Sequence, residues 1–279
     1  MSDYTRNLPA ADICHLGPND LFVELHRGKR SADEHSNRPP LLFVHGAFTG
    51  SWMWAKYIPH FIAHGSDAFY LNLRGHYKSR SVDLSRVVFA DYLADIELAI
   101  DTIIDGYQVA PILVGFSMGG LLSLKTAEST SLSGLVLIDS SIPSQVHTMA
   151  PYAHPPAPIT GLVVPAPLRP ENSSLDETLE DIAFQRKYLS LEAANVFRNL
   201  ARPYGETGIS VAGENITCPS LVISAISHPD DDLRGQALAL HTRSEYFGLP
   251  GTTHTGLLVG QRYGEVVTRI LAWLDSRPT

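Results

Sequence analysis

Apolar residues in this sequence gather in short runs, separated by polar segments and by longer stretches with helical spacing. One run, residues 41–46, is apolar almost throughout and ends at Gly46, which is typical of a strand buried on both faces, as in a parallel sheet. The complete set of expected strands covers residues 13–17, 21–27, 41–46, 68–73, 111–116, 134–139, 220–225 and 244–249.

Between these strands lie segments whose apolar positions recur at helical spacing. Residues 89–105 and 263–276 show this pattern, and residues 121–130 begin a helix soon after the strand at 111–116. Because strands alternate with helices, the sequence predicts an α/β fold in which a mostly parallel central sheet has helices on both faces.

One segment interrupts the alternation. Residues 142–170 contain eight prolines and little periodicity, and residues 174–201 resemble two helices. We therefore predict one core domain, residues 1–141 and 207–279, with a small cap, residues 142–206, inserted between two strands of the sheet.

The composition limits the class of protein. The 279 residues are 44% hydrophobic and 18% charged, which is enough apolar material for a sizeable core. The net charge of −8 and the lack of a basic run argue against nucleic-acid binding. Cys14 and Cys218 match no metal spacing and fit a reducing compartment. Since no signal peptide and no run of the ~20 apolar residues of a membrane helix is seen, we expect a cytoplasmic monomer or homodimer that binds a small molecule and no membrane.

The candidate chemistry centres on the sequence GFSMG, residues 115–119, between a predicted strand and a predicted helix. In this context G-x-S-x-G predicts a sharp turn that holds the serine in strained backbone geometry. Gly115 and Gly119 would relieve clashes with neighbouring backbone, and the hydroxyl of Ser117 would project from the carboxyl edge of the sheet. We interpret Ser117 as a nucleophile.

A second turn follows the strand at 41–46. Gly46 allows the chain to turn so that the N–H of Ala47 faces the same site, and the N–H of Met118 lies at the start of the predicted helix. Together these two donors would form an oxyanion hole, in which each donor typically contributes about 3–4 kcal/mol of transition-state stabilisation.

Four motifs in this order, LLFVHGAFTGSWMW, NLRGHYKS, GFSMGG and LPGTTHTG, resemble the α/β-hydrolase superfamily along nearly the whole chain. HGAFTGSWMW is most similar to the esterase and hydroxynitrile-lyase branch. NLRGHYKS departs from the usual D-x-R-G-x-G-x-S at Asn72 and Tyr77, which concerns the shape of a loop. A serine at position 117, where some branches have aspartate, argues against epoxide hydrolases and haloalkane dehalogenases. The resemblance implies the α/β-hydrolase fold. Because no glycine-rich phosphate loop of G-x-G-x-x-G or Walker type occurs, we expect no cofactor, and we expect no metal.

The resemblance also implies a catalytic histidine beyond the last strand. His254 lies there, between Gly251 and Gly256 in LPGTTHTG. In the triad order of this fold, serine, acid and then histidine, it would take the proton of Ser117 and return it to the leaving group.

The triad acid is less constrained. The family usually places it after the strand at 220–225, where the register puts His228 at the acid position and an alignment on the following helix favours Asp230. Asp231 and Asp139, which ends the strand at 134–139, are the alternatives. Carboxylates at 230–232 also suit the N-terminus of a helix, where they complement its dipole.

The predicted cap is apolar, aromatic and rich in proline, and such a lining suits an apolar acyl or alcohol group. The candidate substrate-binding residues are Phe48, Met149, Tyr152, Phe184 and Tyr188.

Taken together, these features predict a serine hydrolase, of the carboxylic-ester hydrolase or lactonase type, that cleaves an ester, lactone or related acyl bond of a small, largely apolar substrate. The alternatives are an acyltransferase, cyclase or lyase that uses the same triad, and a ligand-binding receptor that retains the fold without catalysis.

Overall fold

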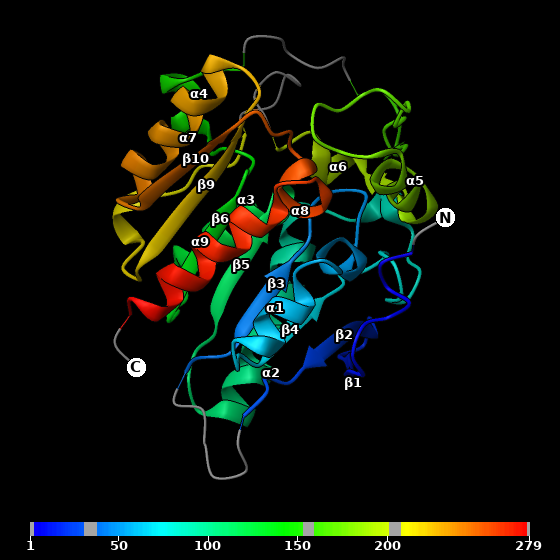
Figure 1. Ribbon diagram of the computed structural model, residues 1–279, viewed down its shortest axis with the longest axis vertical. Helices are drawn as coiled ribbons and strands as arrows, with labels where there is room; N and C mark the ends of the chain where they lie inside the picture. The colour runs from blue at the N-terminus through cyan, green and yellow to red at the C-terminus, as the bar shows by residue number, and fades with distance from the viewer. Residues whose placement is uncertain (1–2, 31–37, 153–158, 201–207, 278–279) are drawn as a thin grey trace.

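The computed structural model describes residues 3–30, 38–152, 159–200 and 208–277, and its centre is an eight-stranded sheet (Figure 1). The strand order is β1-β2-β4-β3-β5-β6-β9-β10; β1 and β2 are antiparallel to their neighbours, and all other pairs are parallel. All eight strands overlap segments predicted as strands, with ends that differ by a few residues. Their bounds are β1 Asp12–Leu16, β2 Leu21–His26, β3 Leu41–Val44, β4 Ala68–Leu71, β5 Ile112–Phe116, β6 Gly134–Ile138, β9 Ser220–Ile226 and β10 Glu245–Pro250.

Helices cover both faces of this sheet (Figure 1). One face packs against η1 (Ser51–Trp54), α1 (Ile58–Ala63), α8 (Gly256–Val259) and α9 (Tyr263–Asp275); the other packs against α2 (Phe89–Tyr107), α3 (Met118–Ala127) and α7 (Pro229–Thr242). Successive side chains of a strand point to opposite faces of the sheet. In β3, Leu42 and Val44 join the cluster with α2 and α3, whereas Leu41 and Phe43 join the cluster with α1 and α9.

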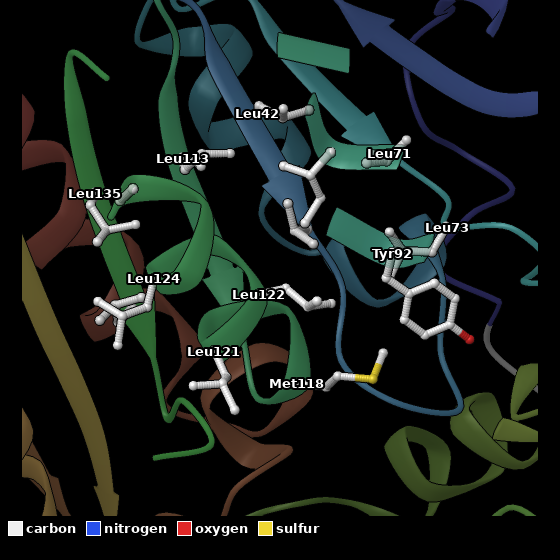
Figure 2. Packing of buried hydrophobic residues seen from close by; sticks show 14 of the residues in the cluster. Leu42, Leu71, Leu73, Tyr92, Leu113, Met118, Leu121, Leu122, Leu124 and Leu135 are labelled. Carbon is white, nitrogen blue, oxygen red and sulfur yellow. The ribbon is translucent and has the colours of Figure 1, made fainter. Parts of the chain in front are cut away.

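Helix α3, which begins directly after the serine turn, is almost completely buried. Leu121, Leu122 and Leu124 pack with strand residues such as Leu113 and Leu135, as Figure 2 shows. Nine of the ten residues of α3 are buried, because the helix packs against both the sheet and α2. This packing fixes the N-terminus of α3, and with it the turn at Ser117.

The segment between β6 and β9 forms small elements, of which α5 and α6 lie near the carboxyl ends of the parallel strands (Figure 1). They include the two helices expected within 174–201. The bounds are α4 Ser144–Met149, β7 Val163–Val164, α5 Leu179–Tyr188, β8 Glu192–Ala193, α6 Ala194–Phe197 and η4 Gly213–Asn215; η2, Leu84–Arg86, lies in the core. β7 and β8 pair in a separate two-stranded sheet. The cap boundaries at 142 and 206 stay a prediction.

In the part of the chain that the structure describes, none of the helices combines the length and the apolar character that crossing a membrane requires.

Candidate active site

Ser117 occupies the turn between β5 and α3 with φ 55° and ψ −119°, a backbone region that few non-glycine residues adopt. The flanking glycines make room for this turn. A Cβ at Gly119 would lie 2.4 Å from the carbonyl oxygens of Val44 and His45, and one at Gly115 would lie 2.5 Å from the carbonyl oxygen of Gly119. The strained turn predicted from G-x-S-x-G is therefore present, and only glycine fits on either side of it.

Two backbone N–H groups lie beside this turn. Met118 is the first residue of α3, and the N–H groups of a helix's first turn have no partner within the helix. The loop after β3 approaches closely, because a Cβ at Gly46 would lie 3.0 Å from the Cβ of Ser117. Within the described residues, the N–H groups of Ala47 and Met118 donate to no protein acceptor. The two predicted oxyanion donors therefore keep their hydrogen atoms for a ligand.

His254 follows β10, and its Nδ1 lies 2.5 Å from Oδ2 of Asp139. The other carboxylate oxygen, Oδ1, accepts a hydrogen bond of 3.1 Å from the N–H of Ala225, which fixes the carboxylate at the end of β6. The imidazole ring also stacks on Phe116, with ring centroids 4.6 Å apart. An Nδ1–H held in this way leaves Nε2 of His254 to act as a base.

The preferred prediction, that Asp230 contacts His254, is wrong. Asp230 lies in the first turn of α7, is 40% exposed at its side chain and faces His228 at 3.4 Å. Asp231 accepts hydrogen bonds from the N–H groups of Ser227 and His228, so it caps the same helix. Both carboxylates complement the helix dipole there. The alternative prediction, Asp139, is the one that the geometry brings to His254.

Ser117, Asp139 and His254 line one cavity of about 240 Å³ at the carboxyl edge of the sheet. The other described residues around it come from the β6 end, the start of the inserted segment, β9 and α7. They are Ser140, Ser141, Ile142, Tyr152, Ser224, Asp231, Arg234, Gly235 and Leu238. This lining is more polar than the apolar cap predicted from the sequence.

Of the five predicted substrate-binding residues, Tyr152 alone is among the described residues that line the cavity. Phe184 and Tyr188 instead pack on Trp52, with ring centroids 5.4 and 5.5 Å away, and Tyr188 donates to Asp3. These aromatic side chains pack α5 against the core, which is the usual role of buried apolar residues. Met149 is 53% exposed, and the ring of Phe48 packs on Phe197. These four residues are not among the described residues that line this cavity, and their part in substrate binding stays a prediction.

His45, beside Gly46, has a structural role. Its Nδ1 donates to the carbonyl oxygen of Gly46 at 2.8 Å, and its Nε2 accepts from the N–H of Leu73 at 3.1 Å. Burial, together with the positive charge of His76, lowers the pKa of His45 to about 3. A neutral imidazole with both nitrogens occupied holds the loop and has no free nitrogen for catalysis.

Sequence reasoning missed Glu192, in β8, which reaches the loop that carries Ala47. Its buried carboxylate accepts four hydrogen bonds, from the N–H of Phe48 at 3.2 Å, His76 Nε2 at 3.0 Å, the hydroxyl of Tyr92 at 2.7 Å and the N–H of Ala193 at 2.7 Å. Burial opposes ionisation of Glu192, but the charge and hydrogen bond of His76 outweigh it and lower the pKa of the carboxyl. Only a spatial contact could have revealed this role.

A metal site is not formed by the described residues, which contain no group of three or more His, Cys, Asp or Glu side chains able to hold an ion.

Comparison with known proteins supports the predicted fold. The model of the alpha/beta hydrolase family matches residues 41–269. A soluble variant of monoglyceride lipase from Saccharomyces cerevisiae superposes with TM-score 0.72 at 14% identity, covering 100% of this chain and 98% of that one. A monoacylglycerol lipase from Paleococcus ferrophilus gives TM-score 0.64 at 18% identity, covering 91% and 98%. Methylketone synthase I from tomato gives 0.65 at 16%, covering 87% and 99%. A search of curated sequences finds no significant match.

Proposed function

Because this chain belongs to the alpha/beta hydrolase family, we propose that it is a serine hydrolase that cleaves an ester, lactone or related acyl bond of a small molecule. The observation that supports this most directly is the contact between His254 and Asp139 in the wall of the cavity that Ser117 also lines. A nucleophile, a base and an orienting carboxylate at one cavity are what acyl transfer requires.

In the proposed reaction, Oγ of Ser117 attacks the substrate carbonyl while Nε2 of His254 takes its proton. The N–H groups of Ala47 and Met118 hold the resulting oxyanion. His254 then gives the proton to the leaving alcohol, and the acyl group remains on Ser117. Water attacks this acyl-enzyme, again with His254 as base, and the acid product and free Ser117 are released. Asp139 stabilises the imidazolium in both steps.

The cavity volume supports a small substrate. At about 240 Å³, it lies below the range of roughly 300–1,000 Å³ that is usual for drug-sized ligands. We therefore expect short acyl and alcohol groups to be accepted in preference to long fatty chains.

A fluorophosphonate probe tests the nucleophile, since it phosphonylates activated serines without any requirement for a particular substrate. We expect the wild type to be labelled on Ser117 and to hydrolyse p-nitrophenyl acetate, and the Ser117→Ala variant to do neither. Ser123→Ala is the matched control: Ser123 is a buried serine of α3 whose Oγ has no hydrogen-bond partner among the described residues, so this variant retains labelling. A folded wild type that stays unlabelled contradicts the proposal and favours a ligand-binding receptor. Formation of an ester from added methanol in place of the acid would indicate an acyltransferase.

A further inference from the structure

We propose that the substrate carries a carboxylate group, and that Arg234 binds it in the cavity of Ser117. This inference rests on the proposed function, since it names the chemical class of substrate for the same site. The sequence alone suggested an apolar substrate, but two of the aromatic residues behind that expectation, Phe184 and Tyr188, pack on Trp52 instead. What faces the cavity instead includes one guanidinium group and several hydroxyl groups.

Arg234 lies in α7, and its side chain lines the cavity together with Ser117 and His254 while being only 14% exposed. A guanidinium has five N–H donors in a fixed planar arrangement. Its contacts with described residues use two of them: Nη2 donates to Oδ1 of Asp231, and Nη1 donates to the carbonyl oxygen of Pro151 at 3.4 Å. The other donors remain for a ligand, and planar donor pairs match the two oxygens of a carboxylate.

The guanidinium is also held in place before any ligand arrives. Its central carbon lies 4.9 Å from the ring centre of Tyr152, so the cation packs over the aromatic face. The ion pair with Asp231 restrains it from a second side. Because these contacts already restrict the long side chain, binding an anion costs less conformational entropy than it would with a mobile arginine.

The described lining holds two carboxylates and one guanidinium, and each carboxylate already has a partner. Asp139 faces His254, and Asp231 is the other carboxylate of the lining. Asp231 shares its negative charge with the N–H groups of Ser227 and His228 at the positive end of the α7 dipole, so it offsets the charge of Arg234 only in part. The hydroxyl groups of Ser140, Ser141 and Ser224 lie in the same lining and can add hydrogen bonds to a carboxylate.

The test compares two pairs of substrates that match in size and differ in charge. In the first pair, monomethyl glutarate and its primary amide, the acyl part of the ester carries the carboxylate or the amide. In the second pair, para-acetoxybenzoate and para-acetoxybenzamide, the alcohol part of the ester carries the carboxylate or the amide. We expect the wild type to prefer the anionic member of at least one pair by about tenfold in kcat/KM, as one charge-assisted hydrogen bond provides.

In the Arg234→Gln variant, the ratio of anionic to neutral kcat/KM should fall to about one, and Arg234→Lys should retain part of it. Arg27→Gln is the matched control, because Arg27 is an exposed arginine that pairs with Asp12 away from the cavity, and it should keep the wild-type ratio. If Arg234→Gln does not fold, inhibition of the wild type by free glutarate, compared with glutaramide, measures the same preference without a variant.

Equal kcat/KM for both members of both pairs, or a ratio that persists in Arg234→Gln, overturns the inference while Ser117 labelling and neutral-ester hydrolysis keep the proposed function standing. A folded enzyme that cleaves none of the four esters and is not labelled on Ser117 overturns both.

Discussion

The carboxylate of Glu192, in the inserted segment, lies 3.0 Å from Nε2 of His76, in the core, and both side chains are fully buried. The same carboxylate accepts from the N–H of Phe48, and the carbonyl oxygen of Phe48 accepts from the N–H of Ser190 at 2.9 Å. The inserted segment is therefore bonded through both backbone polar groups of Phe48 to the loop that carries Ala47. Phe48 itself has φ 67°, a conformation that these bonds help to hold.

We predict that Glu192→Gln destabilises the protein by about 3 kcal/mol, because it leaves His76 without a counter-charge in a buried site. Urea unfolding measures this loss. A double-mutant cycle with His76→Gln checks the cause: the double variant should be less destabilised than the sum of the single variants. Additive losses would show that the two side chains do not interact as the contact indicates.

The pair also predicts a pH window. Burial opposes the charge of His76, but Glu192 outweighs it and raises the pKa of His76, so this contribution is lost as pH rises through the folded value, above 6.5. The lowered pKa of Glu192 gives a contribution that is lost as pH falls below 4.5. The difference in stability between wild type and Glu192→Gln should thus be largest between these two values.

Replacing the triad acid distinguishes the two candidate aspartates. Asp139→Asn keeps an oxygen for the N–H of Ala225 but loses the charge beside His254, so we expect kcat to fall by roughly a thousandfold or more. Asp230→Asn should stay within about twofold of the wild type, since Asp230 contacts the exposed His228. Initial rates with p-nitrophenyl acetate measure both variants, with circular dichroism to verify folding. A larger loss in Asp230→Asn than in Asp139→Asn would instead identify Asp230, in α7, as the triad acid.

The glycines of the serine turn can be tested by stability. Gly119→Ala would bring a Cβ to 2.4 Å from two backbone oxygens, so we expect a loss of about 3 kcal/mol or more in the free energy of unfolding. Gly106→Ala, in α2, is the matched control: no atom lies within 4 Å of its added Cβ, and alanine should stabilise the helix by about 0.5–1 kcal/mol. Equal effects of the two substitutions in urea unfolding would contradict the close approach at Gly119.

The sequence was sufficient for features that depend on local backbone and burial. Strands apolar on both faces could belong only to a covered sheet, and Gly115 and Gly119 reflect clashes that any residue with a Cβ would make. Identifying the triad acid required more than local backbone geometry and burial. Asp139 and Asp230 both follow strands at the same edge, and which one reaches His254 is decided by the path of the loop after β10.

Four of the five predicted substrate-binding residues lie outside the described lining of the cavity for a different reason. Phe184 and Tyr188 have the side chains of a ligand-binding lining, but packing on Trp52 uses the same apolar surface. Glu192 could not be foreseen, because three of its four partners lie about a hundred or more residues away in the chain and the sequence around it shows no pattern. Long-range contacts of single side chains are the part of a site that periodicity does not encode.

The last prediction concerns His26, at the end of β2. The side chain is 2% exposed, its Nδ1 has no hydrogen-bond partner among the described residues, and its ring packs edge-on against Tyr70 at 5.6 Å. Burial lowers the pKa of His26 to about 4 from 6.5. As pH falls below 6.5, the unfolded chain takes up a proton that the folded protein still excludes, so folding stability decreases toward the folded pKa.

His26→Phe keeps the edge-to-face contact with Tyr70 and removes the titrating nitrogen. Between about pH 7 and pH 4.5, we expect the wild type to lose about 1–2 kcal/mol more than this variant in urea unfolding. His60→Phe, at an exposed position, should follow the wild type. His45, whose pKa is lowered to about 3, destabilises both proteins equally in acid, so its contribution cancels when their stabilities are compared. The remaining difference in the free energy of unfolding is therefore due to His26. Parallel curves for wild type and His26→Phe would mean that His26 takes up its proton without unfolding the strand end.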